Sequence, residues 1–139
     1  MKRLLALAAS LLLLAGCGTN PIDTDVGVRV STVGTTFGRS TPVPFAVQNS
    51  TDAAIQIPAC GGRVQVVAEK LENGGWTAVA DVPCTGGQST APVQVSSGGR
   101  VEGDRAVTAA GQYRLRLVFT VTGGAASRFQ VLSNEFTVT

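Results

Sequence analysis

The sequence predicts an all-β fold, an antiparallel sandwich of two sheets with about seven to nine strands. Three observations support this prediction. Apolar and polar residues alternate along several short segments, glycines recur at nearly regular intervals, and no segment after the first sixteen residues shows a helical period. Alternation with a period of two is typical of strands that bury one face against a core.

The clearest strand is predicted at residues 113–122. Apolar residues at odd positions alternate there with mostly polar residues at even positions: Tyr113, Leu115, Leu117, Phe119 and Val121 against Arg114, Arg116, Val118, Thr120 and Thr122. The same alternation predicts strands at 26–31 and 43–48. Further strands are expected at 54–57, 64–71, 76–79, 101–107 and 128–139, with a short edge strand at 93–95 after Pro92.

Glycines mark the expected turns between these strands. Each glycine or pair follows the last by twelve or thirteen residues: Gly61-Gly62, Gly74-Gly75, Gly86-Gly87, Gly98-Gly99, Gly111 and Gly123-Gly124. Glycine supplies the positive φ that tight turns require. An internal repeat is the competing explanation, but the segments between the glycines share no sequence pattern.

Residues 1–16 are predicted to be a cleaved signal peptide. Met1, Lys2 and Arg3 give a positively charged start, and residues 4–14 are apolar apart from Ser10. This is the layout of a secretory leader. As a helix the apolar run would extend about 16 Å, against a hydrocarbon core of about 30 Å, so it is too short to span a membrane.

The leader ends in Leu14-Ala15-Gly16-Cys17, which resembles the lipobox of bacterial lipoproteins. The resemblance implies that Cys17 receives diacylglycerol, becomes the first residue after cleavage, and holds the protein on a membrane through acyl chains such as palmitate. Several chains anchor durably, since each buried methylene contributes about 0.8 kcal/mol. Gly18, in place of aspartate, implies the outer membrane facing the periplasm in a Gram-negative cell. The alternative is an ordinary secretory signal whose cleavage site happens to hold a cysteine.

Residues 17–24 are predicted to form a lipidated tether. The segment after Cys17 is polar and interrupted by Pro21, and at about 3.3 Å per residue it reaches only about 25 Å. The remaining 115 residues, 25–139, are enough for one domain with a core. The domain should therefore lie close to the membrane surface.

Cys60 and Cys84 are predicted to form a disulfide. With Cys17 acylated they are the two remaining cysteines, in an exported chain where disulfides persist. A metal pair or a redox pair is the alternative, but the chain has no CxxC spacing and no histidine. Closing this loop would stabilise the domain by about 3 to 4 kcal/mol in the chain-entropy model.

The charge balance gives no indication of a nucleic-acid partner. The chain has eleven Lys and Arg and nine Asp and Glu, but Lys2 and Arg3 leave with the leader, so the mature balance is nearly neutral. No basic run is interleaved with aromatic residues. The lipid on Cys17 is thus the one membrane contact that we expect.

Three segments resemble the immunoglobulin-like domains of small bacterial envelope lipoproteins. They are Phe45-Ala46-Val47-Gln48-Asn49-Ser50-Thr51-Asp52, Gly111-Gln112-Tyr113-Arg114-Leu115 and Ser133-Asn134-Glu135-Phe136-Thr137-Val138. The resemblance covers most of residues 43–139 and implies an immunoglobulin-like sandwich. It also implies that Tyr113 acts as a tyrosine corner, with its ring buried and its hydroxyl bonded to nearby backbone; a plain core tyrosine is the alternative.

The cysteine pair departs from antibody domains, whose disulfide joins distant strands across the two sheets. Cys60 and Cys84 are only 24 residues apart, with Trp76 between them. We therefore expect the bridge to tie a loop after the third strand to one after the fifth. Trp76 is expected to be buried or partly buried, an exposed binding aromatic being the alternative.

Catalytic chemistry is largely excluded by residue type. Without histidine, a Ser or Cys nucleophile lacks its usual base. Lys70, the one lysine outside the leader, lies in Glu69-Lys70-Leu71-Glu72, which suggests a solvated strand end. The acidic residues are scattered rather than paired as in a glycosidase.

A metal or nucleotide cofactor is also not expected. The pairs Asp23 with Asp25 and Glu102 with Asp104 lie in no calcium-loop pattern, and solvated charge is the favoured interpretation. No glycine pair precedes Lys-Ser or Lys-Thr, as a phosphate-binding loop would require.

The leading functional hypothesis is a non-catalytic binding or accessory module of the cell envelope. It would present loops or a sheet edge to an unidentified envelope protein or a glycan. One alternative is a protease inhibitor that uses the loop at residues 81–92, held at Cys84, as a substrate mimic. The other is a purely structural spacer.

Overall fold

The computed structural model describes residues 26–81, 83–123 and 127–139. The regular elements there are all strands, which confirms the all-β prediction: β1 (Val28–Thr32), β2 (Thr36–Phe37), β3 (Val43–Asn49), β4 (Ile55–Ile57), β5 (Ala59–Cys60), β6 (Arg63–Val64), β7 (Val67–Glu72), β8 (Gly75–Ala78), β9 (Val93–Val95), β10 (Arg100–Arg105), β11 (Gly111–Val121), β12 (Arg128–Leu132) and β13 (Phe136–Val138). None of the described residues forms a helix capable of crossing a membrane. The predicted signal peptide, the tether and Cys17 lie outside the described residues.

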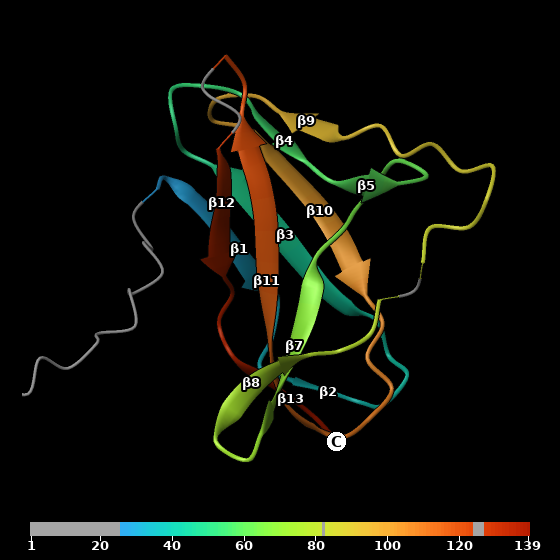
Figure 1. Ribbon diagram of the computed structural model, residues 1–139. Helices are drawn as coiled ribbons and strands as arrows, with labels where there is room; N and C mark the ends of the chain where they lie inside the picture. Colours follow the sequence, from blue (N-terminus) through green and yellow to red (C-terminus); the bar gives the residue numbers. More distant parts are fainter. Residues whose placement is uncertain (1–25, 82, 124–126) are drawn as a thin grey trace, which may run out of the picture.

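The strands form two main sheets that pack against each other (Figure 1). The smaller sheet has the order β1-β3-β10. The larger has the order β2-β13-β11-β4-β9, with β12 and β7 also paired to β11 and β8 paired to β7. The pairings are antiparallel except that of β13 with β2. Because β1 belongs to the smaller sheet and β2 to the larger, the chain changes sheets between them.

Strand β11 is the centre of the larger sheet. One of its edges pairs with β13 and then β12, and the other pairs with β7 and then β4. Between β4 and β7 the chain leaves the sheet to form the separate β5–β6 hairpin. The hairpin is therefore an excursion from one edge of the sheet, and Cys60 lies on it.

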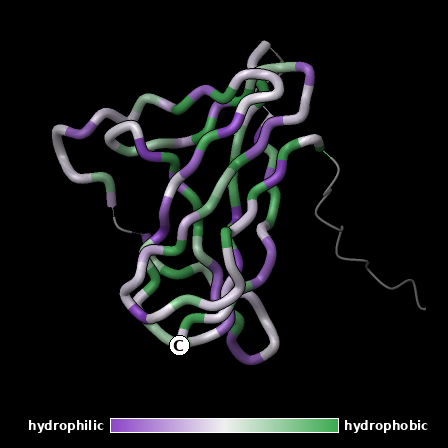
Figure 2. The backbone as a smooth tube through the Cα atoms, turned by 180° about the vertical axis from the view of Figure 1, so that it is seen from behind, coloured by the Kyte–Doolittle hydropathy of each residue, from purple (hydrophilic) through white to green (hydrophobic). Residues whose placement is uncertain are grey.

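The core lies between the two sheets, as the alternating pattern predicts. Odd-numbered residues of β11 from Tyr113 to Phe119 are buried, and the even-numbered residues between them are half-buried. Figure 2 shows this alternation of hydrophobic and hydrophilic residues along the strands. The largest fully buried side chains come from both sheets: Tyr113, Phe45, Phe119, Phe136, Ile55, Ile57, Leu115 and Leu117.

Two of the predicted glycine turns are tight hairpins. Asn73 and Gly74 connect β7 to β8 with φ of 50° and 80°, and Gly61 and Gly62 connect β5 to β6 with φ of 58° and 78°. A two-residue hairpin with positive φ at both central positions matches the twist of the strands it joins. These turns set the register of both hairpins.

The prediction of one strand at residues 128–139 is wrong, because the segment contains β12 and β13 with a break at residues 133–135. The hydroxyl of Ser133 accepts the hydrogen bond from Leu115 N, 2.8 Å away, and so replaces a backbone acceptor of the ladder. Asn134 then turns its amide toward Thr32. Side-chain hydrogen bonds of this kind compete with regular strand pairing.

The prediction of one strand at residues 64–71 is also wrong. Residues 65–66 separate β6 from β7. Gln65 N donates a hydrogen bond of 2.8 Å to Pro58 O, which lies outside the strand ladders. The two-residue strands β2 and β5 were not predicted at all. Alternation is not recognisable over two residues, so neither carries a sequence signal.

Tyr113 confirms the predicted tyrosine corner. Its ring is 1 % exposed, and its hydroxyl donates to Ala109 O at 2.8 Å, just before β11 begins. Together with the two packed and mainly antiparallel sheets, this contact identifies the domain as an immunoglobulin-like sandwich.

Candidate binding surfaces

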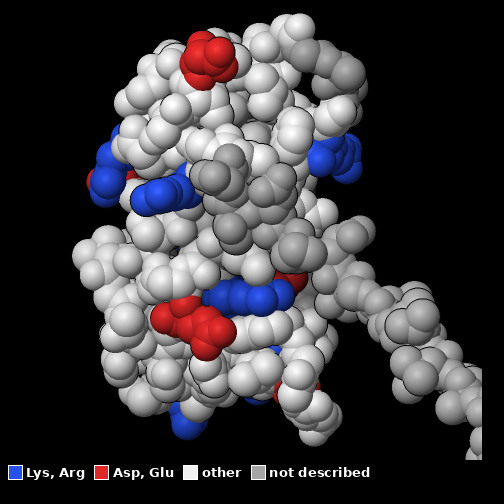
Figure 3. Space-filling view, turned by 90° about the vertical axis from the view of Figure 1, so that its left-hand side faces the viewer, with Lys and Arg blue, Asp and Glu red and all other residues white. Residues whose placement is uncertain are grey.

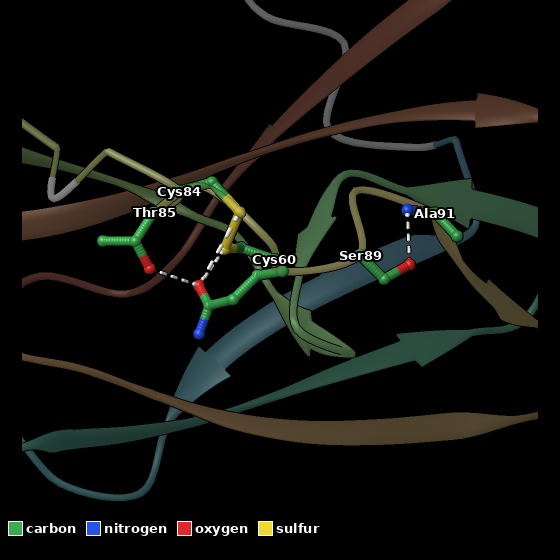
Figure 4. The surroundings of a disulfide bond; sticks show 6 residues. Cys60, Cys84, Thr85, Ser89 and Ala91 are labelled. Atoms are coloured by element: carbon green, nitrogen blue, oxygen red, sulfur yellow. Dashed lines mark hydrogen bonds between the residues drawn. A yellow bond between two sulfur atoms is a disulfide. The ribbon is translucent and has the colours of Figure 1, made fainter.

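Cys60 and Cys84 form the predicted disulfide, with Cα atoms 5.7 Å apart. It joins β5 to the long connection between β8 and β9 (Figure 4). That connection extends away from the sandwich beside β5, at the right of Figure 1. The bridge therefore links the β5–β6 hairpin to the β8–β9 connection and does not join the two main sheets. This was expected, because the two cysteines are only 24 positions apart in the sequence.

Further contacts restrain the disulfide-linked loop, residues 81–92. Gly61 N donates to Ser89 O at 2.8 Å, and Thr85 Oγ1 donates to Gln88 Oε1 at 3.2 Å. Gln88 Oε1 also lies 3.0 Å from Cys60 Sγ. Because a disulfide sulfur carries no hydrogen, this approach is a close contact and not a hydrogen bond. The described residues of the loop are exposed except the half-buried Cys84.

Of the two acidic pairs noted in the sequence, Glu102 with Asp104 lies among the described residues. No group of three or more possible metal-binding side chains occurs among those residues. Glu102 pairs with Arg100 at 2.9 Å, and Asp23 and Asp25 lie outside the described residues. Lys70 pairs with Glu72 at 3.2 Å near the end of β7.

The outer face of the larger sheet, the side turned away from the core, carries an ion-pair cluster. Glu69 Oε2 accepts from Arg114 Nε at 2.8 Å, and Glu69 Oε1 accepts from Arg116 Nε at 2.7 Å. Glu69 is only 8 % exposed, so the predicted solvated strand end is wrong at this residue. Two guanidinium groups on one carboxylate leave the cluster with a net charge of about +1.

Trp76, on the neighbouring strand β8, adds an aromatic ring to this cluster. The Arg114 guanidinium carbon lies 4.4 Å from the centre of the Trp76 ring, within the range of a cation–π interaction. Trp76 is half-buried, as predicted, but it lies on the outer face rather than in the core. Arg114 is thereby held by a carboxylate and by an aromatic ring, and its side chain remains 20 % exposed.

A hollow of about 350 Å³ lies on the same face of the larger sheet. Its base is formed by β11, at Val118 and Thr120, and β12 contributes Arg128. Thr90 and Pro92 of the disulfide-linked loop form part of its wall. The hollow adjoins the ion-pair cluster. Val118 lies two residues beyond Arg116 on β11, and its partner on β12 is Gln130. Gln130 Oε1 in turn lies 3.4 Å from Arg116 Nη1. We call the ion-pair cluster and this adjoining hollow the outer-face surface.

The charges on the face shown in Figure 3 are dispersed. Figure 3 shows basic side chains in separate places, some of them beside acidic side chains, and no extended patch of one sign. This distribution fits the small formal net charge of +2 that the full chain carries.

Asn49 is a structural residue that the sequence analysis did not identify. It is fully buried, and its Nδ2 lies 2.8 Å from Ala53 O, 3.1 Å from Val95 O and 3.0 Å from Ser96 O. Its Oδ1 accepts from Thr51 N and Thr51 Oγ1. One local pattern could have indicated this role. An asparagine at the end of a strand, followed here by Ser50 and Thr51, is typical of a turn in which the asparagine side chain accepts a backbone hydrogen bond.

No protein-family model matches the chain, and no curated protein sequence matches it. Two solved structures show a distant likeness. One is the PapD-like domain 7 of human CEP192, at 11 % identity and a TM-score of 0.42, covering 94 % of this chain and 95 % of that one. The other is the Pseudomonas fluorescens alkylpurine DNA glycosylase AlkC, at 8 % identity and a TM-score of 0.38, covering 81 % of this chain and 30 % of that one. Likenesses at this level indicate nothing about function.

Proposed function

We propose that this protein is a non-catalytic binding module of the bacterial envelope, anchored by lipid on Cys17, and that its outer-face surface contacts a protein partner. The anchoring part of the proposal is supported by the positively charged leader and by Leu14-Ala15-Gly16-Cys17. The absence of histidine from the whole chain supports a non-catalytic role. In a Gram-negative cell, Gly18 after the cysteine favours the outer membrane.

The composition of the outer-face surface is the main support for a binding role. It joins a tryptophan and two arginines, the residue types enriched at interface hot spots, to a hollow lined by apolar and polar groups. The cluster is preorganised, because Glu69 and Trp76 already hold Arg114. A partner would therefore lose little side-chain entropy here on binding.

Photocrosslinking in cells tests this role with the full lipidated chain. A photoreactive amino acid at Val118, in the hollow, should give a discrete protein adduct after illumination. The same amino acid at Glu102, on the exposed face of the smaller sheet, is the matched control and should not give that adduct.

Three results would contradict the proposal. Identical adducts at Val118 and Glu102 would mean that the surface has no preference for a partner. Adducts sensitive to glycosidase treatment would identify a glycan partner instead. No adduct at either position would favour the structural spacer.

A protease inhibitor is the second candidate, and the restraint of residues 81–92 favours it. The described residues of the loop other than Cys84 are exposed, a disulfide holds the loop, and Gly61 N of the β5–β6 hairpin donates to Ser89 O. A substrate-mimicking loop needs such restraint, because ordering a free loop on the protease would weaken binding. Incubation of the protein with a panel of proteases checks this role. An inhibitor would slow one of them at near-stoichiometric ratio and remain uncleaved, whereas rapid cleavage within the loop would exclude the role.

A further inference from the structure

Glu69 holds two arginines by the same nitrogen of each side chain. Its carboxylate oxygens accept from Arg114 Nε at 2.8 Å and from Arg116 Nε at 2.7 Å. In a guanidinium group the Nη nitrogens lie beyond Nε and carry most of the N–H donors. Glu69 therefore binds the inner donor of each arginine and leaves the outer donors available.

Most of these outer donors have no partner within the described residues. Arg116 Nη1 lies 3.4 Å from Gln130 Oε1, and the remaining Nη nitrogens of the two arginines make no hydrogen bond there. In the same ranges, the one buried side-chain nitrogen or oxygen that lacks a partner is Arg105 Nε. The unpartnered Nη nitrogens of Arg114 and Arg116 are therefore not buried, and they reach solvent.

The surroundings shield these donors partly from water. The side chains of Arg114 and Arg116 are 20 % and 25 % exposed, and the Trp76 ring covers the Arg114 guanidinium group from one side. A partly shielded charge attracts an anion more strongly than a fully solvated one, because less water screens it. The donors are also already oriented, so their ordering on binding costs little entropy.

The charge of this region favours an anionic group. Glu69 neutralises one of the two arginines, which leaves the cluster with a net charge of about +1. Arg128, which lines the adjoining hollow, is exposed and makes no ion pair in the part of the chain that the structure describes. A guanidinium group can bind a carboxylate through two parallel hydrogen bonds. One carboxylate would therefore neutralise the cluster and use its unpartnered donors.

The hollow lies at a defined distance from these donors. Arg116 and Val118 occupy alternate positions of β11 on the outer face, two residues apart, which is about 6.8 Å along a strand. Pro58 and Pro92 add apolar surface to the hollow. In an extended peptide, residues two apart also project on one side at this spacing. The surface thus matches an acidic residue and an apolar residue at alternate positions of an extended segment.

We infer that the outer-face surface binds an extended segment of its protein partner that carries an aspartate or glutamate and an apolar residue two positions apart. The acidic side chain would accept from the Nη donors of Arg114 and Arg116, and the apolar side chain would enter the hollow beside Val118. The arginines would supply selectivity for a carboxylate, and burial of the apolar side chain would supply affinity. The inference rests on the proposed function, because it specifies how the proposed partner is recognised.

The fluorescence of Trp76 reports binding at this surface directly, because Trp76 is the one tryptophan in the chain and contacts Arg114. The full chain, purified in detergent, is titrated with an eight-residue peptide of serine and alanine with blocked termini. The peptide carries one glutamate and, two residues later, one leucine. The emission of Trp76 should change and reach a plateau at millimolar peptide.

Two control peptides test the two contacts separately. Glutamine in place of the glutamate keeps the shape but removes the charge, and it should weaken binding by about fivefold or more, because hydrogen bonds to charged groups are stronger than neutral ones. Moving the leucine next to the glutamate keeps the composition but places the two side chains on opposite sides of an extended segment. This peptide should also bind more weakly.

Arg114→Lys provides the matching change in the protein. Lysine keeps a positive charge beside Glu69 but lacks the planar pair of Nη donors, so the glutamate peptide should bind about fivefold more weakly. Arg100→Lys, on the smaller sheet, is the matched control and should bind like the parent protein. Urea midpoints show whether both variants are folded. If Arg114→Lys does not fold, the comparison of the glutamate and glutamine peptides decides the question.

Crosslinking at Val118 in cells separates a failure of this inference from a failure of the proposed function. An adduct that is lost with Arg114→Lys and persists with Arg100→Lys would support both. An adduct that persists undiminished with Arg114→Lys would retain the protein partner but overturn its recognition through an acidic residue. No adduct in the parent would contradict the proposed function, and the peptide titration would then decide the inference by itself.

Three results of the titration would overturn the inference. The first is an unchanged Trp76 emission at millimolar glutamate peptide, and the second is equal binding of the glutamine peptide. The third is an equal response to free glucuronate, because the surface would then bind any carboxylate, including that of a glycan, without a need for the protein segment.

Discussion

The ring of Phe45 lies directly against the backbone of Gly103 on the neighbouring strand. The two residues are opposite each other in the pairing of β3 with β10. A Cβ atom at Gly103 would lie 2.6 Å from Phe45 Cζ, closer than two carbon atoms can approach. Phe45 is 1 % exposed, so its ring is enclosed in the core. The glycine is therefore required by the packing of the smaller sheet on the core.

Replacement of Gly103 by alanine should thus destabilise the domain by about 1 to 3 kcal/mol, the usual range for overpacking a core. Urea unfolding followed by circular dichroism measures this change. Gly86→Ala is the control, because a Cβ there meets nothing within 4 Å and Gly86 has no positive φ. Equal midpoints for the two variants would show that Phe45 can adjust.

Asn49→Ala should cost about 2 to 4 kcal/mol of folding free energy. The substitution removes the side-chain donor to the buried carbonyl of Val95 and the acceptor of Thr51 N, and each buried group left unpaired costs about 1 to 3 kcal/mol. The same urea experiment measures the loss, with Gln94→Ala on an exposed position of β9 as the control. A loss no larger than that of Gln94→Ala would mean that the buried amide is not needed for stability.

Loss of the disulfide should lower stability by about 3 to 4 kcal/mol, since the bridge closes a loop of 24 residues. The double variant Cys60→Ala with Cys84→Ala should melt at a lower temperature than the parent protein. Its melting temperature should not respond to a reducing agent, whereas that of the parent should fall. An unchanged parent under full reduction would contradict a stabilising role for the bridge.

Glu69→Gln should destabilise the domain by about 1 to 3 kcal/mol, because it removes the carboxylate shared by Arg114 and Arg116 and leaves two positive charges adjacent. The loss should decrease at high salt, which screens the remaining repulsion. Glu72→Gln is the control, because Glu72 is 48 % exposed and makes one exposed pair with Lys70. Similar losses for both variants would show that the cluster is only surface charge.

Much of the fold was predictable because its signals are local. The alternation around Tyr113 gave the central strand, and the glycine pairs at 61–62 and 74–75 gave two hairpin turns. These patterns depend on neighbours in the sequence, so one chain suffices to recognise them. The disulfide followed from counting cysteines, with Cys17 set aside because of its predicted acylation.

The remaining features depend on contacts between distant segments. The break at Ser133 depends on the hydrogen bond from Leu115 N. The burial of Glu69 depends on Arg114 and Arg116 of β11, the neighbouring strand in the sheet. A local sequence such as Glu69-Lys70-Leu71-Glu72 looks solvated because its partners lie more than forty positions further along the chain. The outer-face surface is a product of strand order, which alternation does not specify.

The mass of the N-terminal peptide of the protein extracted from membranes tests the central proposal most directly. If the protein is lipid-anchored, this peptide begins at Cys17 and carries the added mass of a diacylglyceryl group with further acyl substitution. The Cys17→Ser variant should lack that mass and leave the membrane fraction. An unmodified peptide, or a chain that begins at another residue and still remains with the membrane, would contradict the proposal.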